Sequence, residues 1–176
     1  MRDEVIQKLV DTGVLEGKRI FTTNKQYDRF LRPIKKQYEM KPSGLWYSVG
    51  SAWIDWCLGE QFGGIGKYIY EIELNPKANI KFLSTAEEVF EFSQKYRRVD
   101  SFYSGMSSCH VDWKEVMWNY DGVEVSPYLQ ELRFSHNLIW YYGWDVPSGC
   151  LWRAVAKKKI TLIAEYNDKK KEFVLL

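Results

Sequence analysis

The sequence predicts an α+β fold in which short helices flank packed, largely antiparallel sheets, in a single domain that spans residues 1–176. Three observations lead to this prediction. Segments with the periodicity of strands outnumber those with the periodicity of helices, the helical segments lie early and in the middle of the chain, and the chain ends in two strands joined by a turn.

Helices are predicted where apolar residues recur at helical spacing. Residues 3–12 place Val5, Ile6 and Leu9 on one face, and Gly13 ends this helix. Ser84 and Glu87 form a capping-box pattern ahead of a helix. The helical segments after the first are 24–40 (interrupted by Pro33), the turn-to-helix segment that begins at Ser51, 85–96 and 112–119.

Strands are predicted where apolar and polar residues alternate. Residues 68–74, with the sequence YIYEIEL, show this alternation most clearly. Asp121-Gly122 is a turn signal ahead of another strand. The full set of predicted strands is 18–23, 45–48, 68–74, 79–83, 123–126, 137–146 and a terminal hairpin of 160–166 with 172–176.

The composition limits the kinds of protein that this chain can be. Hydrophobic residues make up 45% and charged residues 27%, as in a globular protein. A formal charge of +2 neither requires nor excludes a nucleic-acid partner. Aromatic residues make up 16% of the chain, which is enough both to fill a core and to line a site for a flat ligand.

The cysteines and histidines indicate a reducing compartment and no metal site. Three widely spaced cysteines do not form a disulfide framework, so a cytoplasmic location is expected. The two histidines lack metal-ligand spacing, so no metal site is predicted. No signal peptide and no run of about 18 apolar residues is present, so no membrane contact is expected.

One aromatic constellation stands between residues 44 and 57. A strand passes through a glycine turn into a helix, with aromatic rings on both limbs and serines at the bend. Such a unit can stack a planar ring while a hydroxyl bonds its amide. The other interpretation is an ordinary strand–turn–helix with core aromatics and a capping serine. The residues in question are Trp46, Tyr47, Ser48, Ser51, Trp53 and Trp56.

Glu124 interrupts an apolar strand between Val123 and Val125. A carboxylate there is either buried with a partner, directed into a cleft, or pointed at solvent. In a cleft it can stabilise a positively charged, oxocarbenium-like sugar. The strand 18–23 ends in hydroxyls, and Thr22 there can hold a ribose or phosphate or simply end a sheet strand.

Taken in order, these elements resemble the NAD-dependent ADP-ribosyltransferase family, over about residues 18–128. Gly44 to Ser48 is similar to the Gly-x-aromatic-aromatic-Ala/Ser strand of that family, and Ser51 to the serine that holds the nicotinamide amide. Trp53 or Trp56 resembles the stacking aromatic, and Glu124 the catalytic glutamate. The resemblance implies an ADP-ribosyltransferase-like fold that binds NAD as its substrate.

The chain also departs from that family. No histidine stands on its first strand, where the poly-ADP-ribose branch has His-Gly. The toxin branch has an arginine there; Arg19 is near that place, but Thr22 lies closer to the expected position. Gly122 replaces the second Glu or Gln of the toxin branch, which puts modification of protein arginine in doubt.

The resemblance implies a mono-ADP-ribosyltransferase of the toxin or defence type, found in bacteria and phages, for which a neutralising antitoxin is an expected partner. Its acceptor is a macromolecule, with RNA or DNA slightly preferred over protein because aromatic platforms and lysine runs can act together on a strand. The alternative is a non-catalytic binding module that stacks bases or sugars on its aromatic residues. A glycoside-processing enzyme, with Glu124 paired with Glu131 or Asp121, is a third alternative.

Overall fold

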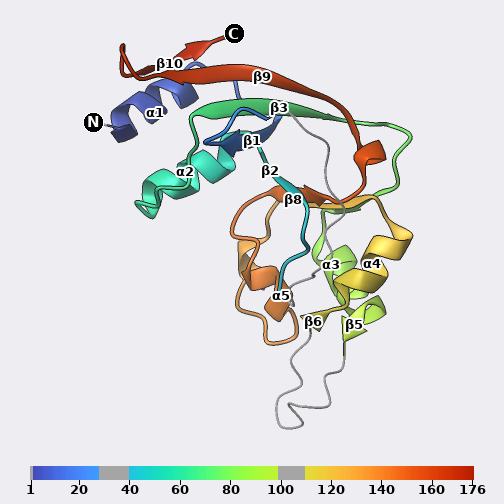
Figure 1. Cartoon of the computed structure of the whole chain (residues 1–176). Helices are drawn as coiled ribbons and strands as arrows, with labels where there is room; N and C mark the ends of the chain where they lie inside the picture. Colours follow the sequence, from blue (N-terminus) through green and yellow to red (C-terminus); the bar gives the residue numbers. More distant parts are fainter. Residues whose placement is uncertain (1, 28–39, 99–109) are drawn as a thin grey trace.

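The structure is a computed structural model that describes residues 2–27, 40–98 and 110–176 (Figure 1). Within these ranges, eight strands form one sheet in the order β10-β9-β3-β1-β2-β8-β7-β4. All neighbouring strands are antiparallel except β4 and β7, which are parallel. The strands are β1 (Arg19–Thr23), β2 (Leu45–Val49), β3 (Tyr68–Leu74), β4 (Ile80–Leu83), β7 (Gly122–Val125), β8 (Ser148–Leu151), β9 (Lys157–Asn167) and β10 (Glu172–Leu175). A separate pair joins β5 (Arg97–Arg98) to β6 (His110–Val111).

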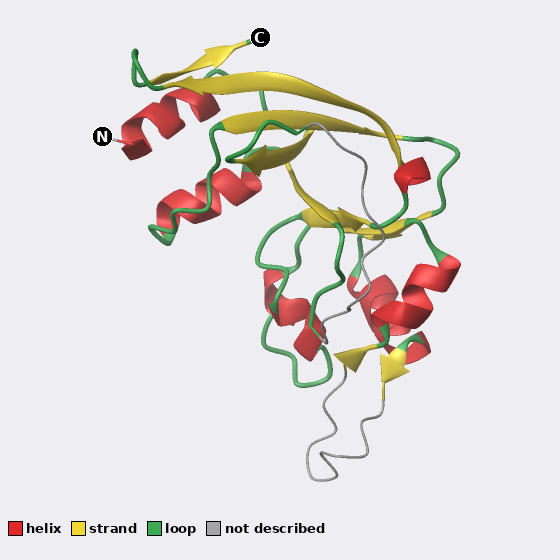
Figure 2. Cartoon of the chain, in the orientation of Figure 1, coloured by secondary structure: helices red, strands yellow, loops and turns green. Residues whose placement is uncertain are grey.

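The helices gather beside the two halves of this sheet, as Figure 2 shows. α1 and α2 lie beside the half made of β10, β9, β3 and β1, whereas α3, α4 and α5 lie beside the half made of β2, β8, β7 and β4. The helices are α1 (Arg2–Asp11), α2 (Ala52–Gly59), α3 (Ala86–Lys95), α4 (Trp113–Asn119) and α5 (Ile139–Tyr142), with short 3-10 turns at Gln130–Leu132 and Ala154–Ala156. The chain is therefore a mixed α/β protein, as the predicted α+β class requires.

The helices cover one face of the sheet, which we call the helix-covered face. Against α1 and α2 this face presents Ile20 and Ile69, and against α3 to α5 it presents Val123 and Cys150. Side chains of consecutive strand residues point to opposite faces. The opposite face carries a smaller cluster in which Leu45 and Leu151 from one half of the sheet meet Ile72 and Ile160 from the other. The sheet therefore curls so that its two halves pack against each other.

Most predicted elements are present, but the strand predicted at 137–146 is wrong. Residues 139–142 form the short helix α5 instead. The Trp140 indole Nε1 donates a hydrogen bond to Ser93 Oγ at 2.8 Å, and the Tyr141 hydroxyl accepts one from the Leu129 N–H at 2.7 Å. Both rings are fully buried in one cluster. A strand would direct these adjacent rings to opposite faces, so a helical turn is what buries them together.

One smaller difference concerns the cap of a predicted helix. The capping box of α3 uses Thr85 and Glu88, one residue later than Ser84 and Glu87. Ser84 instead donates its backbone N–H to the Glu88 carboxylate. Most of the helical segment predicted at 24–40 lies outside the described residues.

Gly149 on β8 leaves space for the Tyr47 ring, which packs directly over it. A Cβ built on Gly149 would lie 2.3 Å from both Cζ and Oη of Tyr47. The Gly149→Ala variant is therefore expected to lower the free energy of unfolding by about 1–3 kcal/mol through overpacking. Gly59→Ala is the control, because a Cβ there meets nothing within 4 Å. Chemical denaturation of both variants tests this, and equal stabilities would contradict it.

Candidate functional site

A pocket of about 290 Å³ opens on the helix-covered face. It lies where neither α1 and α2, on one half of the sheet, nor α3 to α5, on the other half, cover the strands. Its floor is made by β1, β2 and β8, which contribute Thr22, Ser48 and Ser148. Its volume is close to the lower end of the range for small-molecule sites, roughly 300–1,000 Å³. The pocket therefore fits one ring and its immediate substituents.

Indole rings from separate segments form the walls of this pocket. Trp53 enters from α2 and is stacked on Trp56, with ring centroids 5.0 Å apart and an interplanar angle of 14°. Trp46 packs edge-on against Trp144, with centroids 4.8 Å apart, and donates its Nε1–H to the Pro42 carbonyl at 3.1 Å. Each wall is thus held in place by a neighbouring group, which lowers the entropy cost of stacking a ligand.

The floor of the pocket offers hydroxyl groups with complementary hydrogen-bonding capacity. Thr22 Oγ1 accepts a bond from the Gly66 N–H at 3.0 Å, so its own proton is available to donate. Ser48 and Ser148 donate their hydroxyl protons to the Gly50 and Val146 carbonyls, at 3.4 and 2.8 Å, so their oxygens remain acceptors. A planar carboxamide has one acceptor and two donors, which this set matches.

Lys41 adds a positive charge to the pocket lining. Its Nζ lies 5.4 Å from the centroid of the Trp46 ring and 3.6 Å from Asp145 Oδ2. Asp145 also accepts a hydrogen bond from Arg133 Nη2 at 2.9 Å. An incoming anion can form an ion pair with Lys41, because the Asp145 carboxylate then keeps its ion pair with Arg133.

Glu124 lies on the opposite face of the sheet from this pocket. In the registers that link β7, β8 and β2, Glu124 pairs with Gly149, which pairs with Tyr47, whereas Val123 pairs through Cys150 with Trp46. Glu124 Oε2 accepts bonds from Arg19 Nε at 2.6 Å and the Tyr47 hydroxyl at 2.7 Å, and Oε1 accepts one from Arg19 Nη2 at 3.1 Å. The carboxylate is 5% exposed and joins three strands.

These contacts fix the protonation states of the groups around Glu124. Burial of Tyr47, followed by the negative charge of Glu124, raises the pKa of the phenol well above its usual value. Partial burial lowers the pKa of Arg19, but the hydrogen bond and charge of Glu124 outweigh this, so the pKa of Arg19 is raised overall. Tyr47 therefore remains a neutral donor beside an ionised arginine.

A pH dependence of stability follows from Tyr47. Its pKa is raised in the folded state, so its contribution is complete below the unfolded pKa of about 10 and is lost as the pH rises above it. Denaturation of wild type and Tyr47→Phe from about pH 9 to pH 11 is expected to show a stability difference that is constant up to about pH 10 and shrinks above it. A difference that is constant across this range would contradict the assignment.

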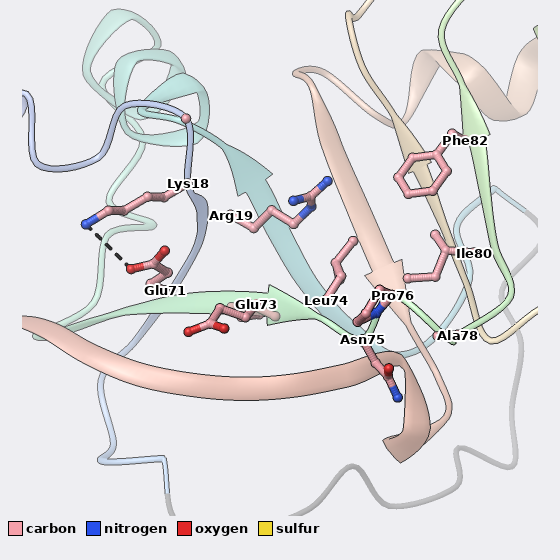
Figure 3. A pocket seen from close by; sticks show the side chains of 12 residues that line it. Lys18, Arg19, Glu71, Glu73, Leu74, Asn75, Pro76, Ala78, Ile80 and Phe82 are labelled. Carbon is pink, nitrogen blue, oxygen red and sulfur yellow. Dashed lines mark ion pairs between the residues drawn. The ribbon is translucent and has the colours of Figure 1, made fainter.

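A further cavity, of about 410 Å³, is shown in Figure 3. It is lined by Arg19, which bonds Glu124, and by Phe82, which pairs with Glu124 across β4 and β7. Its lining mixes Arg19 and the Lys18–Glu71 ion pair, at 3.5 Å, with Glu73 and the exposed ring of Phe82. Glu124 is not among its lining residues. Compared with the aromatic pocket, this cavity has more charge and fewer rings to stack on.

The structure brings together five of the predicted cofactor-binding residues and leaves out the others. The five that line the pocket are Thr22, Trp46, Tyr47, Ser48 and Trp53. The side chain of Tyr47 nevertheless points to the opposite face. Ser51 does not line the pocket, and its hydroxyl donates to Asp55 Oδ2 at 2.6 Å. Trp56 does not line the pocket but stacks on Trp53, which does. The predicted catalytic Glu124 does not line the pocket either.

Several pocket residues were missed by the sequence analysis. Trp144 lies in the segment 137–146 that was predicted as a strand, Ser148 follows it on β8, and Lys41 precedes β2. The aromatic character of that segment was visible in the sequence, but the pairing of β8 with β2 was not. Cys57 and Cys150 are buried free thiols whose pKa values are raised by burial, so neither is an activated nucleophile.

No family model, curated protein or solved structure matches this chain. Among the residues that the structure describes, no group of three or more side chains could hold a metal ion. Within the same residues, none of the helices is long and apolar enough to cross a membrane.

Proposed function

We propose that this chain binds the nicotinamide end of NAD in the aromatic pocket and transfers ADP-ribose to a macromolecule. The observation that carries the proposal is the convergence of Thr22, Trp46, Ser48 and Trp53 on one pocket. These residues were selected from the sequence for their similarity to NAD-dependent ADP-ribosyltransferases. Their position around one pocket supports the proposal even though Glu124 lies on the opposite face of the sheet.

The chemistry of the pocket suits nicotinamide. The ring stacks between Trp46 and Trp53, the carboxamide oxygen accepts from Thr22, and the carboxamide N–H groups donate to Ser48 and Ser148. The volume holds this end of the dinucleotide and not the whole molecule. Lys41, beside Trp46, is placed to meet the diphosphate.

In the proposed reaction, the bond between ribose C1′ and the nicotinamide nitrogen breaks. Its electron pair goes to the ring nitrogen, which leaves as neutral nicotinamide, and positive charge develops on the ribose. The acceptor then bonds to C1′ and releases its proton to water. Asp145 does not line the pocket, but it pairs at 3.6 Å with Lys41, which does, and on this ground we assign stabilisation of the positive charge to Asp145. Glu124 becomes a positioning residue that holds β1, β2 and β7 together.

Nicotinamide release from NAD tests this proposal. Wild-type protein is expected to release nicotinamide, and Asp145→Asn to release it about 100-fold more slowly, the usual effect of losing one preorganised electrostatic contact. Glu124→Gln is the matched comparison and should retain the rate per folded molecule. Loss of nicotinamide release in Glu124→Gln, with release by Asp145→Asn unaffected, would assign stabilisation of the positive charge to Glu124 instead.

A binding module that stacks a base or sugar ring without catalysis is the second candidate. It is favoured by one specific observation: the described residues that line the pocket include no carboxylate. Folded wild-type protein that binds NAD but releases no nicotinamide, with or without added RNA or DNA, would establish this function instead. Because either activity needs a compartment that contains the ligand, we propose the cytoplasm as its location.

A further inference from the structure

An exposed aromatic cluster is connected through side-chain contacts to a wall of the pocket. Phe134 is 75% exposed and Tyr142 is 47% exposed, and their ring centroids are 5.9 Å apart. The guanidinium carbon of Arg133 lies 5.9 Å from the Phe134 centroid and 5.2 Å from the Tyr142 centroid. We call Arg133, Phe134 and Tyr142 the aromatic platform.

A continuous series of contacts links the aromatic platform to the pocket. Arg133 donates to Asp145, Asp145 pairs with Lys41, and Lys41 lies over Trp46, which is a wall of the pocket. Three side-chain contacts therefore connect the platform to the pocket in which the proposed reaction creates positive charge on the ribose. The platform is thus a candidate position for the acceptor.

The chemistry of the platform matches a nucleobase. Aromatic rings next to an arginine are the usual stacking surface for unpaired bases, because each base has a π face and the backbone beside it is anionic. Arg133 and Lys41 provide two positive charges against the single carboxylate of Asp145. The residues next to Phe134 in sequence, Ser135 and His136, are polar and can bond base edges.

We propose that the aromatic platform binds an unpaired base of single-stranded DNA or RNA, which is the acceptor of the transfer. The role of the strand as acceptor rests on the proposed function, whereas the binding of the strand to the platform does not. The lysine run 169–171 plays no part in it, because Figure 1 shows the β9–β10 hairpin far from α5.

Fluorescence anisotropy with a short labelled single-stranded oligonucleotide tests the inference. Loss of stacking on one base weakens binding by about tenfold or more, so Phe134→Ala with Tyr142→Ala is expected to lose at least that factor. Tyr142→Phe should bind as wild type does. Trp118→Ala is the matched control, since Trp118 is also 75% exposed but lies on α4 outside the platform.

The outcomes separate this inference from the proposed function. A double alanine variant that binds the strand as tightly as wild type, or wild type that binds a duplex as tightly as the single strand, would overturn the platform. So would a wild-type protein that binds NAD but no oligonucleotide, which would indicate a protein acceptor. Strand binding that depends on the platform, without nicotinamide release, would support the binding of a strand to the platform and contradict the proposed transferase activity.

Discussion

Replacing Glu124 by alanine is expected to lower the free energy of unfolding by about 3 kcal/mol, the lower end of the range for breaking a buried ion pair. The variant leaves Arg19 and the Tyr47 hydroxyl without the carboxylate that each contacts within 3 Å, at Oε2. Arg19 is 30% exposed and regains some water, which is why the lower end applies. Chemical denaturation at neutral pH measures the loss.

The control for this prediction is Glu71→Ala, on β3, which neighbours the strand β1 that carries Arg19. Its ion pair with Lys18 is longer, at 3.5 Å, and both side chains are more exposed, so it contributes at most about 1 kcal/mol. A double-mutant cycle with Arg19→Met should show strong coupling to Glu124→Ala. Additive effects, or equal losses in Glu124→Ala and Glu71→Ala, would contradict a structural role for Glu124.

Replacing Trp53 by alanine is expected to weaken NAD binding by about 10- to 100-fold, because stacking on an aromatic side chain is worth about 1–3 kcal/mol. Trp53 lines the pocket from the exposed side of its stack with Trp56, so its loss removes one of the two proposed faces for the nicotinamide ring. Calorimetric titration of NAD measures the affinity.

The conservative variant Trp53→Phe keeps a π face and should retain most of the affinity. Both variants need intact circular dichroism, because Trp53 also packs against Phe62, with centroids 5.9 Å apart. A folded Trp53→Ala variant with wild-type affinity would place the nicotinamide ring elsewhere.

The sequence predicts the strands that make up this pocket better than it predicts the site as a whole. β1, β2, β3 and the final hairpin follow from alternation and turn signals, which are local properties. Alternation within β2 was also sufficient to separate Tyr47 from Trp46 and Ser48, which the sequence analysis grouped together. The opposite orientation of Tyr47 is what carries it to Glu124.

The remaining features depend on which strands become neighbours. The pairing of β8 with both β2 and β7 places Ser148 in the pocket and Gly149 beneath the Tyr47 ring. No local pattern specifies these neighbours, because they are far apart in sequence. Arg19 was passed over in favour of Thr22 for the same reason: without the order of the strands, the sequence did not show that Arg19 and Glu124 share a face.

A crystal structure of the chain with bound nicotinamide shows directly whether the ring occupies the aromatic pocket. We expect a ring between Trp46 and Trp53, with its carboxamide within hydrogen-bonding distance of Thr22 and Ser48. A ring bound instead in the cavity on the opposite face, beside Arg19 and Phe82, would contradict it.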